Sequence, residues 1–442
     1  MSLLKRLEQQ RGDSPVVQGT QEVTAKTHSP DAYVFAKERV RTGTIESLND
    51  EKDTNPQKVR EKLEEIIQLE GENIPRLERS RIVNELYDDI MGYGPLEPLL
   101  SDPSITEIMV NGPNQVYIET QGKLKQVDVA LRDQAHLLNI IERIVSQVGR
   151  HVDEASPMVD SRLKDGSRVN VILPPISLVG PVVTIRKFSK KPFTAQNLID
   201  FGSMSPKMVS FLEACVRGRL NVIVSGGTGS GKTTLLNVLS GFIPEDERIV
   251  TIEDAAELQL KQSHVVILES RPSNTEGKGQ ITIRDLVRNA LRMRPDRIIV
   301  GEVRSSEALD MLQAMNTGHD GSLTTTHANT PRDTMSRLET MVMMAGIELP
   351  LIAIRNQIAS AIDIIVQQTR HKDGMRRITN ITEITGMEGD IISMQDIFVY
   401  ETQGQLDSQG KFKGRFKSSG IRPQCLEKIR SNGVAVYEDW FI

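Results

Sequence analysis

A glycine-rich segment over residues 226–234, GGTGSGKTT, has the spacing of a phosphate-binding loop. An apolar run precedes it and a helical pattern follows. In such a loop, backbone N–H groups converge on phosphate oxygens, a lysine brings charge to the terminal phosphates and a hydroxyl binds Mg²⁺. The predicted nucleotide-binding residues are Gly226, Gly227, Thr228, Gly229, Ser230, Gly231, Lys232, Thr233 and Thr234.

Acidic residues follow two other apolar runs. Glu302 comes after RIIVG, and Glu253 and Asp254 end the run TIED. Carboxyl ends of parallel strands share one edge of a sheet, so these acids are expected near the loop. Mg²⁺ keeps several of its waters, which outer carboxylates can hold. We therefore expect Thr233 to bind Mg²⁺ directly, Glu253 and Asp254 to bind it through water, and Glu302 to orient or deprotonate the attacking water.

One histidine and three arginines extend this set. His327 ends the run SLTTTH, on the same expected edge, where it could report the γ-phosphate, although a lone histidine is most often structural. Arg162, Arg168 and Arg186 lie in the region before the loop. Phosphoryl transfer needs positive charge on the phosphate oxygens, and an arginine from a second domain would couple ATP binding to domain closure.

The elements that must position these residues are read from the apolar pattern. From about residue 197, strand-like runs alternate with helices, which predicts a doubly wound α/β core. The runs are LNVIVSG, RIVTIED, HVVILES, RIIVGE, SLTTTH and DIIVQQ. Shorter β-like runs around one helix near 133–148 predict an α+β domain before it.

These patterns divide the chain into six predicted parts. They are a disordered tail (1–56), a helical module (57–103), an α+β N-terminal domain (104–190), a linker (191–196), the P-loop domain (197–392) and a C-terminal extension (393–442). The tail is polar, with few regular apolar repeats. In the extension, Trp440 and Phe441 are expected to dock on the core.

The bulk composition excludes several classes of protein. No window approaches 18 apolar residues, which argues against a transmembrane helix. Two cysteines, Cys215 and Cys425, argue against a disulfide scaffold and favour the cytoplasm. A formal net charge of -5 gives no support to tight, non-specific nucleic-acid binding.

Four segments stand in a fixed order: the phosphate loop, TIEDAAEL, RPDRIIVGEVR and TGHDGSLTTTHANTP. This order resembles the secretion-ATPase superfamily of type II secretion, type IV secretion and type IV pili, where they are called Walker A, Asp box, Walker B and His box. The chain is most similar to the CpaF group, the ATPases of tight-adherence (Tad) pili. That similarity covers about residues 57–395 and includes GYGPLEPLL, ITEIMVNGP, DSRLKDGSRVN, NALRMRPDRIIVGEVR and ALDMLQAMNTGHDGSLTTTHAN.

The resemblance implies a RecA-like P-loop ATPase domain with a parallel, doubly wound sheet, behind the α+β domain and the helical module. It implies a homo-hexamer that hydrolyses ATP with Mg²⁺ at the cytoplasmic face of the inner membrane. The ring would transmit the energy of hydrolysis to inner-membrane pilus platform proteins. These partners alone would attach the ring to the membrane. No nucleic-acid partner is expected. By position, Lys232 and Thr233 hold nucleotide and metal, and Glu302 is the catalytic glutamate. Glu253 belongs to the Asp box, His327 is the box histidine, and Arg162, Arg168 and Arg186 match arginines that reach the γ-phosphate.

Other functions remain open at this point. The first alternative function is that of a DNA- or protein-translocating type IV secretion ATPase. A P-loop kinase would need an arginine-rich lid, and a nucleic-acid motor would need a basic loop facing the pore. A scaffold that binds nucleotide without hydrolysis would not need Glu302.

Overall fold

The computed structural model describes residues 30–49, 55–70, 74–120, 122–188, 192–273, 278–406, 410 and 412–442. The chain divides into two compact units, the first ending at Leu99 and the second running from Leu100 to Ile442. Each unit is described by itself.

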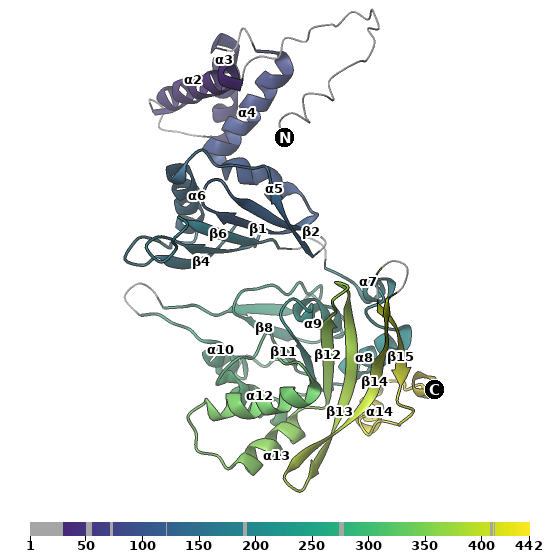
Figure 1. Cartoon of the computed structure of the whole chain (residues 1–442). Helices are drawn as coiled ribbons and strands as arrows, with labels where there is room; N and C mark the ends of the chain where they lie inside the picture. The colour runs from purple at the N-terminus through teal and green to yellow at the C-terminus, as the bar shows by residue number, and fades with distance from the viewer. Residues whose placement is uncertain are drawn as a thin grey trace, which may run out of the picture. The chain divides into compact units, whose positions relative to one another are not determined.

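In the described residues, the first unit contains three long helices (Figure 1). They are α2 (Pro30–Asn49), α3 (Pro56–Glu70) and α4 (Arg76–Met91); the short helix η2 (Gly94–Leu96) follows, and α5 (Glu97–Ser101) crosses into the second unit. Their buried apolar side chains form one cluster of Val40, Val59, Leu63, Ile67, Ile82, Val83 and Leu86. Helices α3 and α4 lie in the region where the sequence predicts a helical module.

Helix α2 corrects the prediction of a disordered tail over residues 1–56. Val40 is completely buried in the cluster, the Thr44 hydroxyl donates to the Val40 carbonyl, and Lys37 pairs with Glu85 of α4 at 2.6 Å. The apolar residues of α2 do not follow a clear helical period. Among its described apolar side chains Val40 is buried, and α3 and α4 supply the rest of the cluster. Residues 1–29 and 50–54 lie outside the described residues.

The second unit begins with a six-stranded sheet in the order β3-β2-β1-β6-β5-β4, antiparallel throughout. Helix α6 (Gln134–Ser146) packs its buried side chains beside this sheet. The sequence predicts α6 and the strands β1, β2, β5 and β6. It does not predict β3 and β4, because these edge strands are polar. The strands are β1 (Ile105–Asn111), β2 (Val116–Thr120), β3 (Lys123–Val127), β4 (Met158–Arg162), β5 (Arg168–Ile172) and β6 (Val182–Arg186).

A nine-stranded sheet follows, in the order β15-β14-β13-β12-β7-β11-β10-β8-β9. The strands from β12 to β9 pair in parallel, and β12 to β15 pair antiparallel. All six strands that the sequence predicts for the core are present, as β7 to β12. The strands are β7 (Val222–Gly226), β8 (Ile249–Glu253), β9 (Val265–Glu269), β10 (Arg297–Val300), β11 (Leu323–Thr326), β12 (Ile364–Arg370), β13 (Arg376–Glu388), β14 (Ile391–Leu406) and β15 (Phe412–Ser418).

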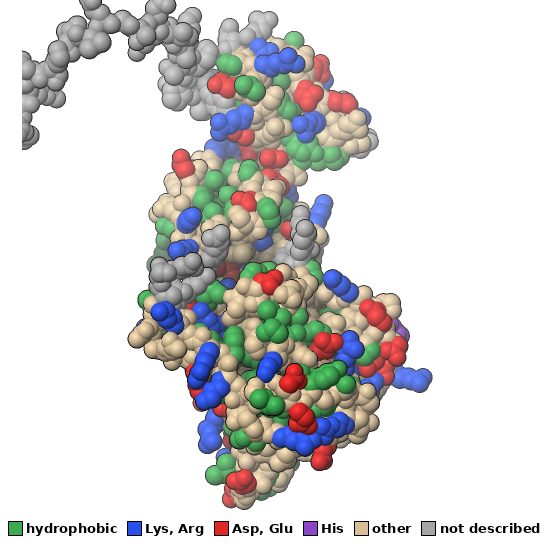
Figure 2. All heavy atoms as spheres, turned by 90° about the vertical axis from the view of Figure 1, so that its right-hand side faces the viewer, with side chains coloured by type: hydrophobic (Ala, Val, Ile, Leu, Met, Phe, Trp, Pro, Cys, Tyr) green, Lys and Arg blue, Asp and Glu red, His purple; other side chains and the backbone are tan. Residues whose placement is uncertain are grey.

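One edge of this sheet is β15, whose charges are paired with those of β14. Glu401 accepts from Arg415 and from Lys417 at 3.3 and 3.0 Å. The face of the molecule on this side shows basic and acidic side chains interspersed (Figure 2). Charged edge strands resist pairing with further strands, so this edge is protected against uncontrolled sheet extension.

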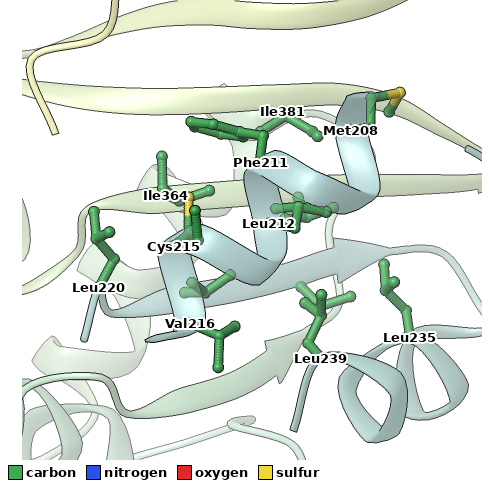
Figure 3. Packing of buried hydrophobic residues seen from close by; sticks show 14 of the residues in the cluster. Met208, Phe211, Leu212, Cys215, Val216, Leu220, Leu235, Leu239, Ile364 and Ile381 are labelled. Atoms are coloured by element: carbon green, nitrogen blue, oxygen red, sulfur yellow. The ribbon is translucent and has the colours of Figure 1, made fainter. Parts of the chain in front are cut away.

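Helices cover both faces of the nine-stranded sheet. Val222 and Val224 of β7 pack in one apolar cluster and Ile223 packs in the other, as alternation along a strand requires. Figure 3 shows α8 laid across the first face, with Phe211, Leu212 and Cys215 against the strands. The first face holds α7 (Ala195–Asp200), α8 (Pro206–Arg217), α9 (Lys232–Ser240), α14 (Leu426–Ser431) and η3 (Glu438–Phe441); the second holds α10 (Ile283–Ala290), α11 (Glu307–Asn316), α12 (Pro331–Met343) and α13 (Leu351–Ala361). The predicted doubly wound α/β fold is confirmed.

The C-terminal region is part of this domain. β14 begins at Ile391 and pairs with β13, so the predicted boundary at 392 falls inside a strand. Trp440 and Phe441 are buried with their rings 5.9 and 5.8 Å from that of Phe211, which confirms their predicted docking. Among the described helices, none is long and apolar enough to cross a membrane.

Candidate nucleotide-hydrolysing site

The phosphate loop connects β7 to α9, as its sequence requires. A Cβ at Gly226 would lie 2.3 Å from the Gln368 carbonyl oxygen, so no larger residue fits there. Gly229 and Gly231 have left-handed φ angles of +67° and +99°. Gly231 precedes α9 without a side-chain cap, which leaves the helix N-terminus to an anion. We call residues 226–234 the P-loop wall.

The P-loop wall borders a cavity of about 540 Å³. The predicted residues Thr228, Gly229, Gly231, Lys232, Thr233 and Thr234 line it, whereas Gly226, Gly227 and Ser230 shape the loop behind. The Lys232 ammonium donates to the Gly227 carbonyl at 3.2 Å, and burial lowers the pKa of Lys232. The remaining lining residues are Gly166, Arg168, Arg186, Lys187, Phe188, Pro192, Phe193, Asn237, Glu257, Gln259, Glu302, Arg304, His327 and Arg337.

Glu302 and His327 reach the cavity from the ends of β10 and β11. Burial alone would raise the pKa of Glu302, but the hydrogen bond and charge of Arg304 and the charge of Lys232 outweigh it and lower that pKa. His327 Nε2 shares a hydrogen bond with Thr228 Oγ1 at 3.2 Å, and its Nδ1 lies 3.9 Å from Glu302 Oε1. Burial and then Lys232 lower the pKa of His327, so the ring is mainly neutral at pH 7.

Glu253 and Asp254 are placed differently from the sequence prediction, because neither lines the cavity. Glu253 is buried, its Oε2 accepts the N–H groups of Glu257 and Leu258 at 2.8 and 3.1 Å, and burial raises its pKa to about 7. Its carboxyl group therefore holds the loop after β8. The acid of this segment that faces the cavity is Glu257.

Asp254 also points to protein partners. It accepts from the Ser270 hydroxyl at 3.0 Å and from Arg304 at 3.3 Å. The hydroxyl of Thr233, by contrast, belongs to the cavity lining together with Glu257 and Glu302. One hydroxyl with nearby carboxylates fits Mg²⁺ that is held mostly by phosphate and water oxygens. In the described part of the chain, no group of three His, Cys, Asp or Glu side chains could hold a metal by itself.

The three predicted arginines lie in one row across the six-stranded sheet. Arg162 pairs across strands with Arg168, Arg168 with Arg186, and Arg186 with Glu107. Directly opposed residues point to the same face, and like charges there repel. Arg168 and Arg186 line the cavity, and we call them the arginine wall; Arg162 does not line it.

Carboxylates offset this repulsion. Arg168 lies 2.9 Å from Glu257, and Arg162 lies 2.8 Å from Glu269, both partners belonging to the P-loop domain. Arg186 has a looser partner, Glu107 at 3.7 Å, and its side chain is 60% exposed. Of the three, Arg186 is thus the arginine least committed to a protein partner.

Sequence reasoning missed several residues of the site. Arg304 pairs with Glu302 at 2.6 Å, and the strand period could have found it, because residues two apart on an extended segment share a side. Arg376 of β13 donates from Nε to the Gly229 carbonyl at 2.9 Å. Nothing in the sequence around Arg376 points to the phosphate loop, since an antiparallel strand brings it there.

Comparison with known proteins agrees with this geometry. Residues 89–417 match the family model described as "Type II/IV secretion system protein". Conjugal transfer protein TrbB of Rhizobium radiobacter is 33% identical over 310 residues, covering 69% of this chain and 91% of TrbB. The type IV secretion system protein VirB11 of Brucella suis is 33% identical over 302 residues, covering 62% and 83%. Among solved structures, the pilus retraction motor PilT with bound ADP is 20% identical, with a TM-score of 0.48 over 75% of this chain and 83% of PilT.

The chain therefore belongs to the type II/IV secretion system protein family. Its nine-stranded domain is a RecA-like P-loop domain behind an α+β domain, and the protein is an ATP hydrolase.

Proposed function

We propose that this protein is a pilus motor ATPase, which converts ATP hydrolysis into movement of its α+β domain against its P-loop domain. One observation carries the proposal. A single cavity brings together the P-loop wall, Glu302 and the arginine wall, and these come from both domains.

Nucleotide binding is the task of the P-loop wall. The free N–H groups at the start of α9 and the loop backbone face the phosphates, and Lys232 adds positive charge. Mg²⁺, when bound with ATP, would neutralise part of the phosphate charge, and the Thr233 hydroxyl is the protein group that would hold it. Glu253 and Asp254 would act on this site only indirectly, through the loop after β8 and through Arg304.

Glu302 is the residue for water activation. Its carboxylate is ionised at neutral pH because its pKa lies below the ordinary value, so it can accept a proton or orient the attacking water. Neutral His327 links this carboxylate to Thr228 of the P-loop wall, where it can report the phosphate. The remaining need is positive charge on the transferred phosphoryl group, and Arg168 and Arg186 supply it.

This division makes movement part of the chemistry. If the arginine wall must close on the γ-phosphate, hydrolysis proceeds only when the α+β domain is in place. We propose that the working form is a homo-hexamer at the cytoplasmic face of the inner membrane. Each closure would be passed to the neighbouring subunit and to a membrane platform protein of a tight-adherence pilus. The four motif segments and their CpaF-like sequences support this choice.

A type IV secretion ATPase is the second candidate. The names of TrbB and VirB11 favour it, because the match to this chain covers more than four fifths of the length of each relative. The net charge of -5 does not favour a nucleic-acid load, and the one face drawn in Figure 2 shows mixed basic and acidic side chains.

The deciding experiment measures ATP turnover of the purified chain alone, with platform protein in lipid vesicles, and with DNA, together with the mass of the particle. We expect a hexamer whose slow turnover rises with platform protein and does not respond to DNA. Glu302→Gln should lower turnover by about 10²- to 10⁴-fold while ADP still binds. Stimulation by DNA alone would instead support a DNA-transfer ATPase.

A further inference from the structure

Arg304 lies between two carboxylates beside the cavity. Its Nη2 lies 2.6 Å from Glu302 Oε2, and its Nη1 lies 3.3 Å from Asp254 Oδ2. Glu302 follows β10 and Asp254 follows β8, and these strands are neighbours in the sheet. A single guanidinium therefore bridges the acid proposed to activate water and an acid from the adjacent strand end.

Hydrogen bonds in the turn after β10 fix the backbone of Arg304, whereas ion pairs to Glu302 and Asp254 hold its side chain. Glu307 is buried and accepts the N–H groups of Arg304 and Ser305 at 2.6 and 2.8 Å. Val303 packs in the core, so Glu302 and Arg304 on either side of it face the cavity. The Arg304 side chain is 55% exposed, so its guanidinium can change partners without disturbing the core.

The Arg304–Glu302 contact opposes the role proposed for Glu302. A carboxylate that accepts a short, charge-assisted hydrogen bond has one oxygen engaged and a weaker tendency to take a proton. Glu302 can therefore work as a base only after Arg304 has moved.

A γ-phosphate offers Arg304 a competing partner. Arg304 lines the same cavity as Lys232 and Thr233, so it lies within the compartment that the phosphates would enter. A guanidinium binds phosphate oxygens in a two-pronged manner, which makes a terminal phosphate a strong rival to the Glu302 carboxylate. ADP has no γ-phosphate and would leave the contact with Glu302 in place.

We infer that Arg304 is an exchange residue, which holds Glu302 until ATP binds and then transfers to the γ-phosphate, releasing Glu302 to the attacking water. Arg304 is thus a positioning residue for Glu302. The inference rests on the proposed function, in which Glu302 activates water. The exchange requires a γ-phosphate, which only a nucleoside triphosphate has. Glu302 is therefore released only when the correct nucleotide is bound.

The test compares four full-length chains: wild type, Arg304→Gln, Glu302→Gln and the double variant. Titration measures the affinity of each for fluorescent ADP and for a non-hydrolysable ATP analogue. Arg304→Gln should weaken analogue binding about 10-fold, since one charge-assisted contact is lost, and leave ADP within about 2-fold. Glu302→Gln frees Arg304 and should tighten analogue binding about 3- to 10-fold, again with little change for ADP. In the double variant this tightening should disappear.

Two results would overturn the exchange. If Glu302→Gln tightens analogue binding equally with and without Arg304, the effect is only the removal of a negative charge. If Arg304→Gln weakens ADP and the analogue equally, Arg304 supports the site without exchanging partners. Arg304→Lys keeps the charge and should keep a preference for the analogue over ADP. Complete loss of that preference in Arg304→Lys would also contradict the exchange. Because these are binding measurements, failure of the proposed function would appear separately, as a wild-type chain that does not hydrolyse ATP.

Discussion

The two walls of the cavity are held in different ways. The P-loop wall is fixed by backbone: Gly226 packs against the Gln368 carbonyl, and the Gly229 carbonyl accepts from Arg376. The arginine wall is held by side chains at the surface. The side chains of Arg168 and Arg186 are 42% and 60% exposed. Arg168 pairs with Glu257, and Arg186 pairs with Glu107.

This difference assigns the two walls different tasks. Exposed ion pairs contribute only about 0–1 kcal/mol each, so an arginine can leave its carboxylate for a phosphate at little cost. A loop packed on backbone atoms cannot shift without disturbing the neighbouring strand. The P-loop wall should therefore bind any nucleotide with a β-phosphate, and the arginine wall should respond to the γ-phosphate.

Between the two walls, the larger effect is expected from a methyl group in the P-loop wall. In Gly226→Ala the new Cβ would lie 2.3 Å from the Gln368 carbonyl oxygen and 2.5 Å from Ser230 Oγ, so the loop must shift. A shifted loop that loses two of its N–H contacts to phosphate should bind both ADP and the ATP analogue about 100-fold more weakly or worse. Titration with fluorescent ADP measures this loss.

Gly227→Ala is the matched control for this change. A Cβ at Gly227 meets nothing within 4 Å, so its ADP affinity should stay within about 3-fold of the wild type. Normal ADP binding by a folded Gly226→Ala chain would show that the P-loop wall is not fixed by packing.

A smaller effect, and one confined to turnover, is expected from the arginine wall. Arg186→Gln removes a charge that acts on the phosphoryl oxygens, so kcat should fall about 10- to 100-fold while ADP affinity stays within about 2-fold. Arg162→Gln is the control, because Arg162 lies in the same row but pairs with Glu269 outside the cavity. Equal losses in the two variants would mean that the row stabilises the sheet and does not serve the nucleotide.

The sequence predicted the P-loop wall better than the arginine wall, for a physical reason. The loop is local: one strand, five residues and one helix are continuous in the chain, and strands β7 to β12 are short apolar runs. The arginine wall depends on the register of three antiparallel strands and, for Arg168, on a carboxylate of the P-loop domain. Single-residue patterns do not encode such pairing, so the separation of Arg162 from the cavity was not predictable.

The same reasoning explains the acids of the site. Position after a strand correctly placed Glu302 and His327 in the cavity, because the carboxyl ends of parallel strands share an edge. It failed for Glu253, whose side chain folds back onto the N–H groups of the following loop, and it overlooked Glu257 on that loop. Strand position predicts the edge of the sheet, but the direction of a side chain there depends on the local turn.

Arg376 provides a test between the two walls. It is an arginine beside the phosphate loop, and its contact is to the backbone of the P-loop wall, through Nε and the Gly229 carbonyl. Arg376→Gln should therefore weaken ADP and ATP analogue binding alike, by about 3- to 10-fold, as expected for one lost contact. A variant that binds ADP normally but loses turnover would place Arg376 with the arginine wall.

The smallest effect on turnover is expected from removing α2, since every described residue that lines the cavity lies at or after Gly166. A chain that starts at Asn55 loses the buried Val40, worth about 1.5–3 kcal/mol of burial, and the ion pair from Lys37 to Glu85. The amides of α3 and α4 should then exchange hydrogen faster, while turnover stays within about 2-fold, because both walls are intact.

A chain that starts at Pro30 keeps α2 and is the control; its α3 and α4 should be as protected as in the full chain. If the shorter chain lost turnover while its second unit kept the wild-type exchange pattern, the first unit would act on the nucleotide site, and the assignment of that site to the two walls alone would be wrong.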